Sequence, residues 1–146
     1  MTVTAHEHHH HAHGGVLGPS AAGLALGVAT LPLHYLLDHG QSVQLAALLA
    51  GVIGAVYAGF AIQGGSIRQM VVEIAVATLF LGGALGAFWI SPWFAPAAVA
   101  LHGVWDWVHH LMPESRDLVA PRPWYPPMCA AYDWVYGLGL ALIWVS

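Results

Sequence analysis

After residue 15, the chain is a succession of apolar stretches of about twenty residues, separated only by short polar, proline or glycine segments. A helix rises 1.5 Å per residue, so about 20 apolar residues span the roughly 30 Å hydrocarbon core of a bilayer. Of the 146 residues, 58% are hydrophobic and only 7% are charged, a balance far from that of a soluble domain. The sequence therefore predicts an all-α fold, a polytopic membrane helix bundle.

About five transmembrane helices are expected, in a single transmembrane domain of residues 16–146 behind a flexible His-rich N-terminal tail of residues 1–15. Short turn-forming segments separate most of the spans, and a longer polar connection at 113–127 precedes the last one. The expected spans are residues 16–37, 41–62, 67–90, 93–112 and 126–145.

The arginines predict the orientation of the bundle. Arg68 opens the third span, and Arg116 and Arg122 lie in the last connection, which an alternating path of five helices places on the same side. The positive-inside rule makes this side cytoplasmic. We therefore expect a multi-pass protein of the cell membrane with its N-terminus in the cytoplasm.

The charge composition excludes several classes of protein. The formal net charge is −4 and the chain has no lysine, which argues against a nucleic-acid partner and rules out a retinal Schiff base. The sequence also lacks a nucleotide-binding glycine loop and a nucleophile elbow. The expected partners are the lipid bilayer and a lipid or small apolar substrate.

The fourth expected span carries its polar residues in one short segment, residues 101–110. His102, Asp106, and His109 or His110 recur there at helical spacing, which places them on one stripe of the helix. A charged side chain at the centre of a membrane helix costs on the order of 3 kcal/mol, so such residues usually pair, bind an ion or line a pathway. This segment is the first candidate site.

Two further carboxylates are expected at a similar depth, roughly 10 Å inside the cytoplasmic boundary: Glu73 on the third span and Asp133 on the fifth. Helix bundles build metal sites from carboxylates and imidazoles of facing helices, and metal binding offsets the repulsion between the acids. The candidate metal ligands are His102, Asp106, His109, His110, Glu73 and Asp133. The candidate catalytic carboxylates are Asp106, Glu73 and Asp133. The expected cofactor is a divalent transition metal, zinc or iron.

A second polar group, His34, Asp38 and His39, ends the first span. Residues 38–40 are also typical of a helix end followed by a turn. If Pro32 breaks the first helix and the span lies closer to Ala47, His34 sits deeper in the bundle and approaches His102. The sequence leaves both readings open.

Two sequence patterns carry a family resemblance. The first is His-Gly-x-Trp-Asp-x-x-His-His at 102–110, and the second is Trp-Tyr-Pro-x-x-Cys-x-x-Tyr-Asp at 124–133. Together they resemble an uncharacterised family of small polytopic integral membrane proteins, mainly bacterial with fungal relatives, and the resemblance implies no activity. The first pattern is also loosely similar to the histidine boxes of membrane desaturases and hydroxylases, which hold two irons. Asp106 stands where those enzymes carry histidine.

Several functions fit these residues. The leading interpretation is an intramembrane metal site near the cytoplasmic side of an enzyme, a hydrolase with zinc or an oxidase with iron. An alternative is a proton or metal-ion transporter, with the N-terminal histidines collecting the ion, although the region around Gly51, Ile53 and Leu79 looks dry. Further alternatives are a b-type haem protein, with His34 and His102 as axial ligands, and a structural membrane subunit.

Overall fold

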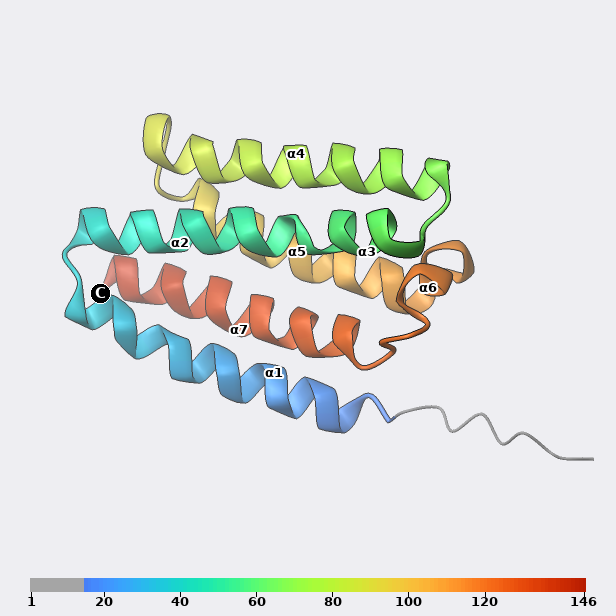
Figure 1. The fold of residues 1–146 in the computed structure, drawn as a ribbon. Helices are drawn as coiled ribbons and strands as arrows, with labels where there is room; N and C mark the ends of the chain where they lie inside the picture. The colour runs from blue at the N-terminus through green and yellow to red at the C-terminus, as the bar shows by residue number, and fades with distance from the viewer. Residues whose placement is uncertain (1–14) are drawn as a thin grey trace, which may run out of the picture.

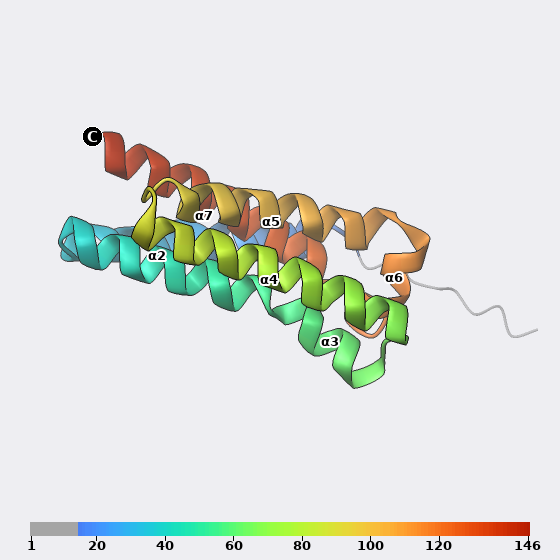
Figure 2. The same cartoon turned by 90° about the horizontal axis from the view of Figure 1, so that it is seen from above.

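Helices run back and forth along one common axis and pack side by side (Figures 1 and 2). The structure is a computed structural model and describes residues 15–146, so the His-rich tail lies outside the described residues, apart from Gly15. No strand occurs in this part of the chain, which confirms the all-α class. The elements are α1 (Leu17–Thr30), a 3₁₀ helix η1 (Leu31–Leu36), α2 (His39–Gly54), α3 (Val56–Gly64), α4 (Ile67–Trp89), α5 (Phe94–Leu111), α6 (Pro113–Val119) and α7 (Tyr125–Val145).

Three helical segments among the described residues are long and apolar enough to cross a membrane. They are His39–Gly64, which joins α2 and α3, then Ile67–Trp89 and Tyr125–Val145. The α1–η1 segment and α5 run alongside them (Figure 1), but neither is among the three segments that are long and apolar enough to cross a membrane. The short helix α6 was not expected and lies inside the connection at 113–127.

Side chains at the helix ends explain where the long helices start. Asp38 caps α2: its side chain accepts from the Gln41 backbone N–H, and the Gln41 side chain accepts in return from the Asp38 N–H. Ser66 and Gln69 form the same capping box at the start of α4. These bonds satisfy backbone donors that a helix start leaves unpaired. Asp38 is therefore the N-cap of α2, and His39 and Gly40 lie in the first turn of this helix rather than in the turn after the first span that the sequence predicts.

The long helical segment His39–Gly64 is interrupted between α2 and α3. Ala55 follows the last residue of α2, and its N–H bonds to the Val52 carbonyl, three residues back (3.2 Å). Helix α3 begins at the next residue. Gly54 lies so close to α4 that an added Cβ would overlap the side chain of Phe80. Breaks of this kind in membrane helices are found where the backbone is buried in protein or lines a cavity. Tyr57 follows this break, and its hydroxyl donates to Asp106 of α5.

Buried alanines fill the half of the bundle that contains the start of α2, the end of α4 and the start of α5. Such small side chains let membrane helices approach closely. The apolar core in this half consists of Val43, Ala46, Ala47, Ala50, Ala84, Ala87, Ala95, Ala98, Val99, Tyr136 and Leu140. The outer surface carries many exposed large apolar side chains, as expected of a surface that faces lipid.

The three arginines lie at the other end of the bundle, which bears α6 (Figure 1). Arg68 opens α4 there, Arg116 lies in α6, and Arg122 follows α6. The start of α1 is at the same end, because the Ser20 hydroxyl donates to the carbonyl of Pro127 at the start of α7 (3.2 Å). The described chain thus carries its arginines at the end where α1 begins.

Candidate metal centre

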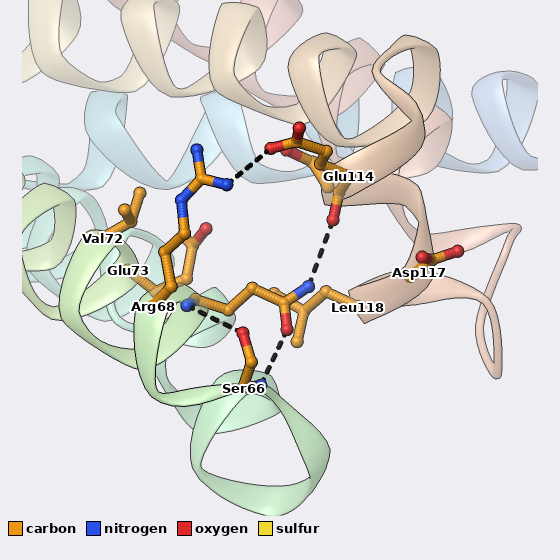
Figure 3. A pocket seen from close by; sticks show the side chains of 9 residues that line it. Ser66, Arg68, Val72, Glu73, Glu114, Asp117 and Leu118 are labelled. Atoms are coloured by element: carbon orange, nitrogen blue, oxygen red, sulfur yellow. Dashed lines mark hydrogen bonds and ion pairs between the residues drawn. The ribbon is translucent and has the colours of Figure 1, made fainter.

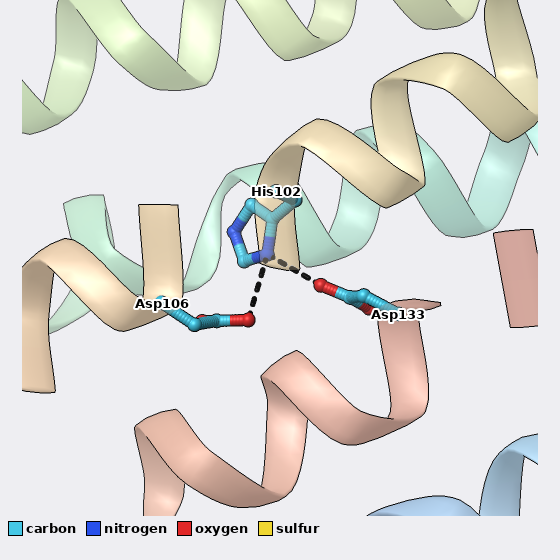
Figure 4. Close-up of side chains that lie close together, drawn as sticks. All are labelled: His102, Asp106 and Asp133. Carbon is cyan, nitrogen blue, oxygen red and sulfur yellow. Dashed lines mark hydrogen bonds and ion pairs between the residues drawn. The ribbon is translucent and has the colours of Figure 1, made fainter. Parts of the chain in front are cut away.

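A buried cluster of His102, Asp106 and Asp133, here called the His/Asp cluster, lies between α5 and α7 (Figure 4). His102 and Asp106 are one turn apart on α5, and Asp133 faces them from α7. Nδ1 of His102 donates to Oδ2 of Asp133 (2.8 Å) and lies 3.5 Å from Oδ2 of Asp106. None of the three is more than 1% exposed. Helix α5 and the facing turn of α7 therefore hold an imidazole and two carboxylates together, away from solvent.

The cluster has polar atoms without partners. Nε2 of His102, Oδ2 of Asp106 and Oδ1 of Asp133 are buried and make no hydrogen bond. Burying such groups unpaired is costly, and an unpaired carboxylate oxygen costs more than a neutral group. Each of the three residues also offers a possible ligand atom within 4.8 Å of those of the other two. The imidazole nitrogen that lies beside both carboxylates is Nδ1, not the unpartnered Nε2. A buried divalent cation fits this arrangement, since two carboxylates and a neutral imidazole would balance its charge.

Tyr57 of α3 adds a third helical segment to the cluster. Its hydroxyl donates to Oδ1 of Asp106 (2.7 Å), and its side chain is 1% exposed. The bond fixes the Asp106 carboxylate so that Oδ1 is satisfied while Oδ2 faces His102. Such bonds behind a metal ligand orient it and raise metal affinity.

A second polar pair, Glu73 of α4 and His109 of α5, lies on the other side of Tyr57. Nε2 of His109 is hydrogen-bonded to Oε1 of Glu73 (3.1 Å), and its Nδ1 is hydrogen-bonded to the Trp105 carbonyl (3.1 Å). The Trp105 indole N–H donates to Oε2 of Glu73 (3.1 Å). The Tyr57 ring stacks on the His109 ring, with centroids 3.8 Å apart and an interplanar angle of 9°. Tyr57 is thus the contact between this pair and the His/Asp cluster.

The six expected ligands therefore do not form one group among the described residues. Three form the His/Asp cluster, and Glu73 and His109 form the pair described above. His110 points elsewhere: its ring packs edge-on against Trp107, with centroids 5.1 Å apart. Helical spacing explains the division, because His110 lies about 100° around the helix from His109.

His34 is buried, as one reading of the sequence proposed, but it belongs to a separate polar group at the other end of the bundle. Its Nδ1 is hydrogen-bonded to the Ser42 hydroxyl (2.7 Å) and its Nε2 to the Tyr136 hydroxyl (2.8 Å). Both ring nitrogens are thus engaged within the protein. The structure lends no support to a haem ligated by His34 and His102.

A polar pocket of about 390 Å³ opens between the start of α4 and α6 (Figure 3). Arg68 and Glu114 form an ion pair at its mouth (3.1 Å), and both side chains are exposed. Gln69 donates to the Glu114 carbonyl (3.1 Å) and so ties α4 to α6. Glu73, only 4% exposed, also lines this pocket. With Asp117, the lining residues carry three carboxylates and one arginine, so the pocket is net negative.

An apolar pocket of about 530 Å³ lies between α4 and α5. Its lining includes Leu79 and Leu101, whose side chains are largely exposed on the outer surface, so the pocket opens sideways. Phe80 and Trp105 form part of its wall. The Phe80 ring packs edge-on against His102, with centroids 4.9 Å apart. One aromatic ring therefore separates this pocket from the His/Asp cluster.

Sequence reasoning missed Tyr57 and Trp105 as functional residues. Tyr57 stands three residues beyond Gly54 in an expected span without acidic or basic residues, so nothing in its immediate neighbourhood pointed to a site. Trp105 is adjacent to Asp106, and its indole N–H could have been matched to a carboxylate on the next helix. Tyrosine and tryptophan inside a membrane bundle need such partners, and this need is the signal that could have found them.

No family model, curated protein or solved structure matches this chain.

Proposed function

We propose that this chain is a membrane-embedded metalloprotein whose His/Asp cluster binds one divalent transition metal, zinc or iron. The observation that carries this proposal is that His102, Asp106 and Asp133 bring possible ligand atoms within 4.8 Å of one another, while one oxygen of each buried carboxylate has no hydrogen-bond partner. A cluster that only fixed helix packing would be expected to satisfy its polar atoms internally. A cation supplies the missing partner to the carboxylates and removes their mutual repulsion.

A single ion with an open coordination position fits the ligand set best. Catalytic zinc sites have three protein ligands and leave the fourth position to water or substrate. Di-iron bundles use many more carboxylates and histidines, whereas Glu73 and His109 bond to each other here. A bound zinc ion would lower the pKa of its water towards neutrality for hydrolysis, and iron would support oxidation.

The apolar pocket supports an enzyme acting on a lipid or a small apolar molecule. It opens sideways between α4 and α5, where a bilayer would surround the protein. A molecule lying in it would be separated from His102 only by the Phe80 ring. We infer that rotation of Phe80 admits the reacting part of the substrate to the metal centre.

We further propose that α1–η1 and α5 also cross the cell membrane, so that the protein has five spans. The arginines then lie on the cytoplasmic side together with the start of α1. The polar pocket would open to the cytoplasm, and the alanine-filled half would separate the His/Asp cluster from the outer face. Because polar residues reach the His/Asp cluster from one face only and buried alanines close the other, the arrangement favours a bound metal over a transport path through the bundle.

The test is metal content by inductively coupled plasma mass spectrometry on purified full-length protein. Replacing the tail histidines with alanine removes their own metal binding. We expect one zinc or iron per chain, lost in Asp133→Asn. Asp117→Asn makes the same chemical change at an exposed position and is expected to keep the metal. Folded protein without stoichiometric metal would contradict the proposal and favour a structural subunit.

A further inference from the structure

The Glu73–His109 pair lies between the polar pocket and the His/Asp cluster, and the contacts along this line are continuous. Glu73 lines the pocket, and its carboxylate is hydrogen-bonded to His109. His109 stacks on Tyr57, and the Tyr57 hydroxyl bonds to Asp106. Among the described residues, these contacts connect an exposed opening to a cluster that is itself closed to solvent.

His109 is held in an orientation suited to a metal ion. Its Nδ1 donates to the Trp105 carbonyl, so Nε2 is the nitrogen that faces Glu73. Histidines that bind metals commonly donate their other ring N–H to a backbone carbonyl, which fixes the tautomer and the ring orientation. A carboxylate and an imidazole nitrogen 3.1 Å apart offer two ligands where the His/Asp cluster offers three.

We propose that Glu73 and His109 form a transient binding site through which the divalent cation passes from the polar pocket to the His/Asp cluster. This inference rests on the proposed function. The net negative lining of the pocket attracts the cation, and Arg68 is drawn to one side by its ion pair with Glu114. Because the pair has fewer ligands than the cluster, the cation binds there more weakly and moves on.

Tyr57 controls the last step of this path. Its ring covers the face of His109, and its hydroxyl holds Asp106. The cation reaches Asp106 when this ring moves aside. The break between α2 and α3, two residues before Tyr57, gives the backbone a point at which to bend.

If Glu73 lies on the path of the cation, its loss should affect metal loading and release differently than if Glu73 were a ligand of the final site. In Glu73→Gln the cluster keeps all three ligands, so the final stoichiometry stays at one ion per chain. The rates of loading and of release to a chelator both fall, by about tenfold to a hundredfold, because a charged group along the path is lost. If Glu73 were instead a final ligand, its loss would lower affinity and speed release.

The experiment follows Co²⁺ by its visible absorption in a stopped-flow instrument. Metal-depleted full-length protein with its tail histidines replaced by alanine is placed in nanodiscs, with Asp38→Asn as the matched control. Asp38 is an exposed acid at the opposite end, and asparagine also caps helices, so loading should not change. A double variant, Glu114→Gln with Asp117→Asn, changes only exposed residues at the mouth and is expected to load several-fold more slowly, less so at high salt.

The outcomes separate the two proposals. Slow loading of Glu73→Gln to full stoichiometry supports the path. Loading of both the Glu73 and the mouth variants at the wild-type rate overturns it while leaving the metal centre intact. If Glu73→Gln does not fold, the mouth variant decides alone. Wild-type protein that binds no Co²⁺ refutes the proposed function itself.

Discussion

The hydroxyl of Tyr57 offers the sharpest test of how the metal centre is built. Tyr57→Phe removes one oxygen atom and leaves the ring, with its stacking on His109, in place. The lost bond is short (2.7 Å) and buried, and it is the contact that fixes the Asp106 carboxylate. Without it, the carboxylate rotates freely and the cluster is no longer arranged for a cation before the cation arrives. We therefore expect weaker metal binding with unchanged stoichiometry.

The size of the effect follows from the type of bond. A hydrogen bond to a charged group contributes about 1.5–3 kcal/mol, and 1.4 kcal/mol corresponds to tenfold in a dissociation constant. Only the share of this free energy that orients the Asp106 carboxylate affects metal affinity. The loss of a hydrogen-bond partner behind a metal ligand typically lowers metal affinity about 10- to 100-fold. We expect a rise of the dissociation constant for Zn²⁺ within this range.

The assay is Zn²⁺ competition against a chelator of known affinity, on protein whose tail histidines are replaced by alanine. Tyr136→Phe is the matched control, because it also removes a buried tyrosine hydroxyl, one bonded to His34 (2.8 Å) in the separate polar group. Both variants should lose stability, Tyr57→Phe more so because its bond is to a carboxylate, while only Tyr57→Phe should lose affinity. Equal affinities for Tyr57→Phe and Tyr136→Phe would refute the reasoning that Tyr57 orients a metal ligand.

Two further predictions concern stability. Adding Zn²⁺ at about 100 times its dissociation constant should raise the free energy of unfolding by about 2.7 kcal/mol, seen as a higher melting temperature, and a chelator should reverse this; a rise of equal size in Asp133→Asn would contradict the assignment of the ligand. Gly23→Ala should destabilise the bundle by about 1–3 kcal/mol, because the added Cβ would overlap the Met128 carbonyl across the α1–α7 contact. Gly18→Ala, where nothing lies within 4 Å, should be neutral or slightly stabilising in the same thermal melt.

Hydropathy and turn residues were sufficient to predict the bounds of α4 and α7 to within one residue. The predicted span 67–90 is observed as Ile67–Trp89, and the predicted span 126–145 as Tyr125–Val145. In a membrane helix, hydrophobic periodicity says less about which residues are in contact, because every face of the helix is apolar. The packing of the helices then decides which helix each face contacts. A helix break at Pro32 is one of the two readings of the sequence, and α1 does end at Thr30, just before it, whereas the break at Gly54 was beyond such reasoning.

The sequence predicts how far along the bundle each candidate site residue lies better than it predicts which residues contact one another. Placing Asp106 and Asp133 at similar depth brought them together correctly, since depth depends only on the rise per residue. Glu73 also has the right depth, yet it bonds to His109 because Tyr57 stands between this pair and the cluster. Tyr57 follows the helix break between α2 and α3, which no local sequence pattern predicts.

The alanine-filled half of the bundle has a mechanical consequence. Side chains that end at Cβ have no rotamers to change, and backbones in direct contact leave no room to slide, so this half behaves as one stiff body. The other half contains the break at Gly54 and Ala55 and the short helix α6. If an ion enters as proposed, we therefore expect α3 and α6 to bend against this stiff half. The bundle is thus expected to be rigid at the end that contains the buried alanines and deformable at the end that bears α6.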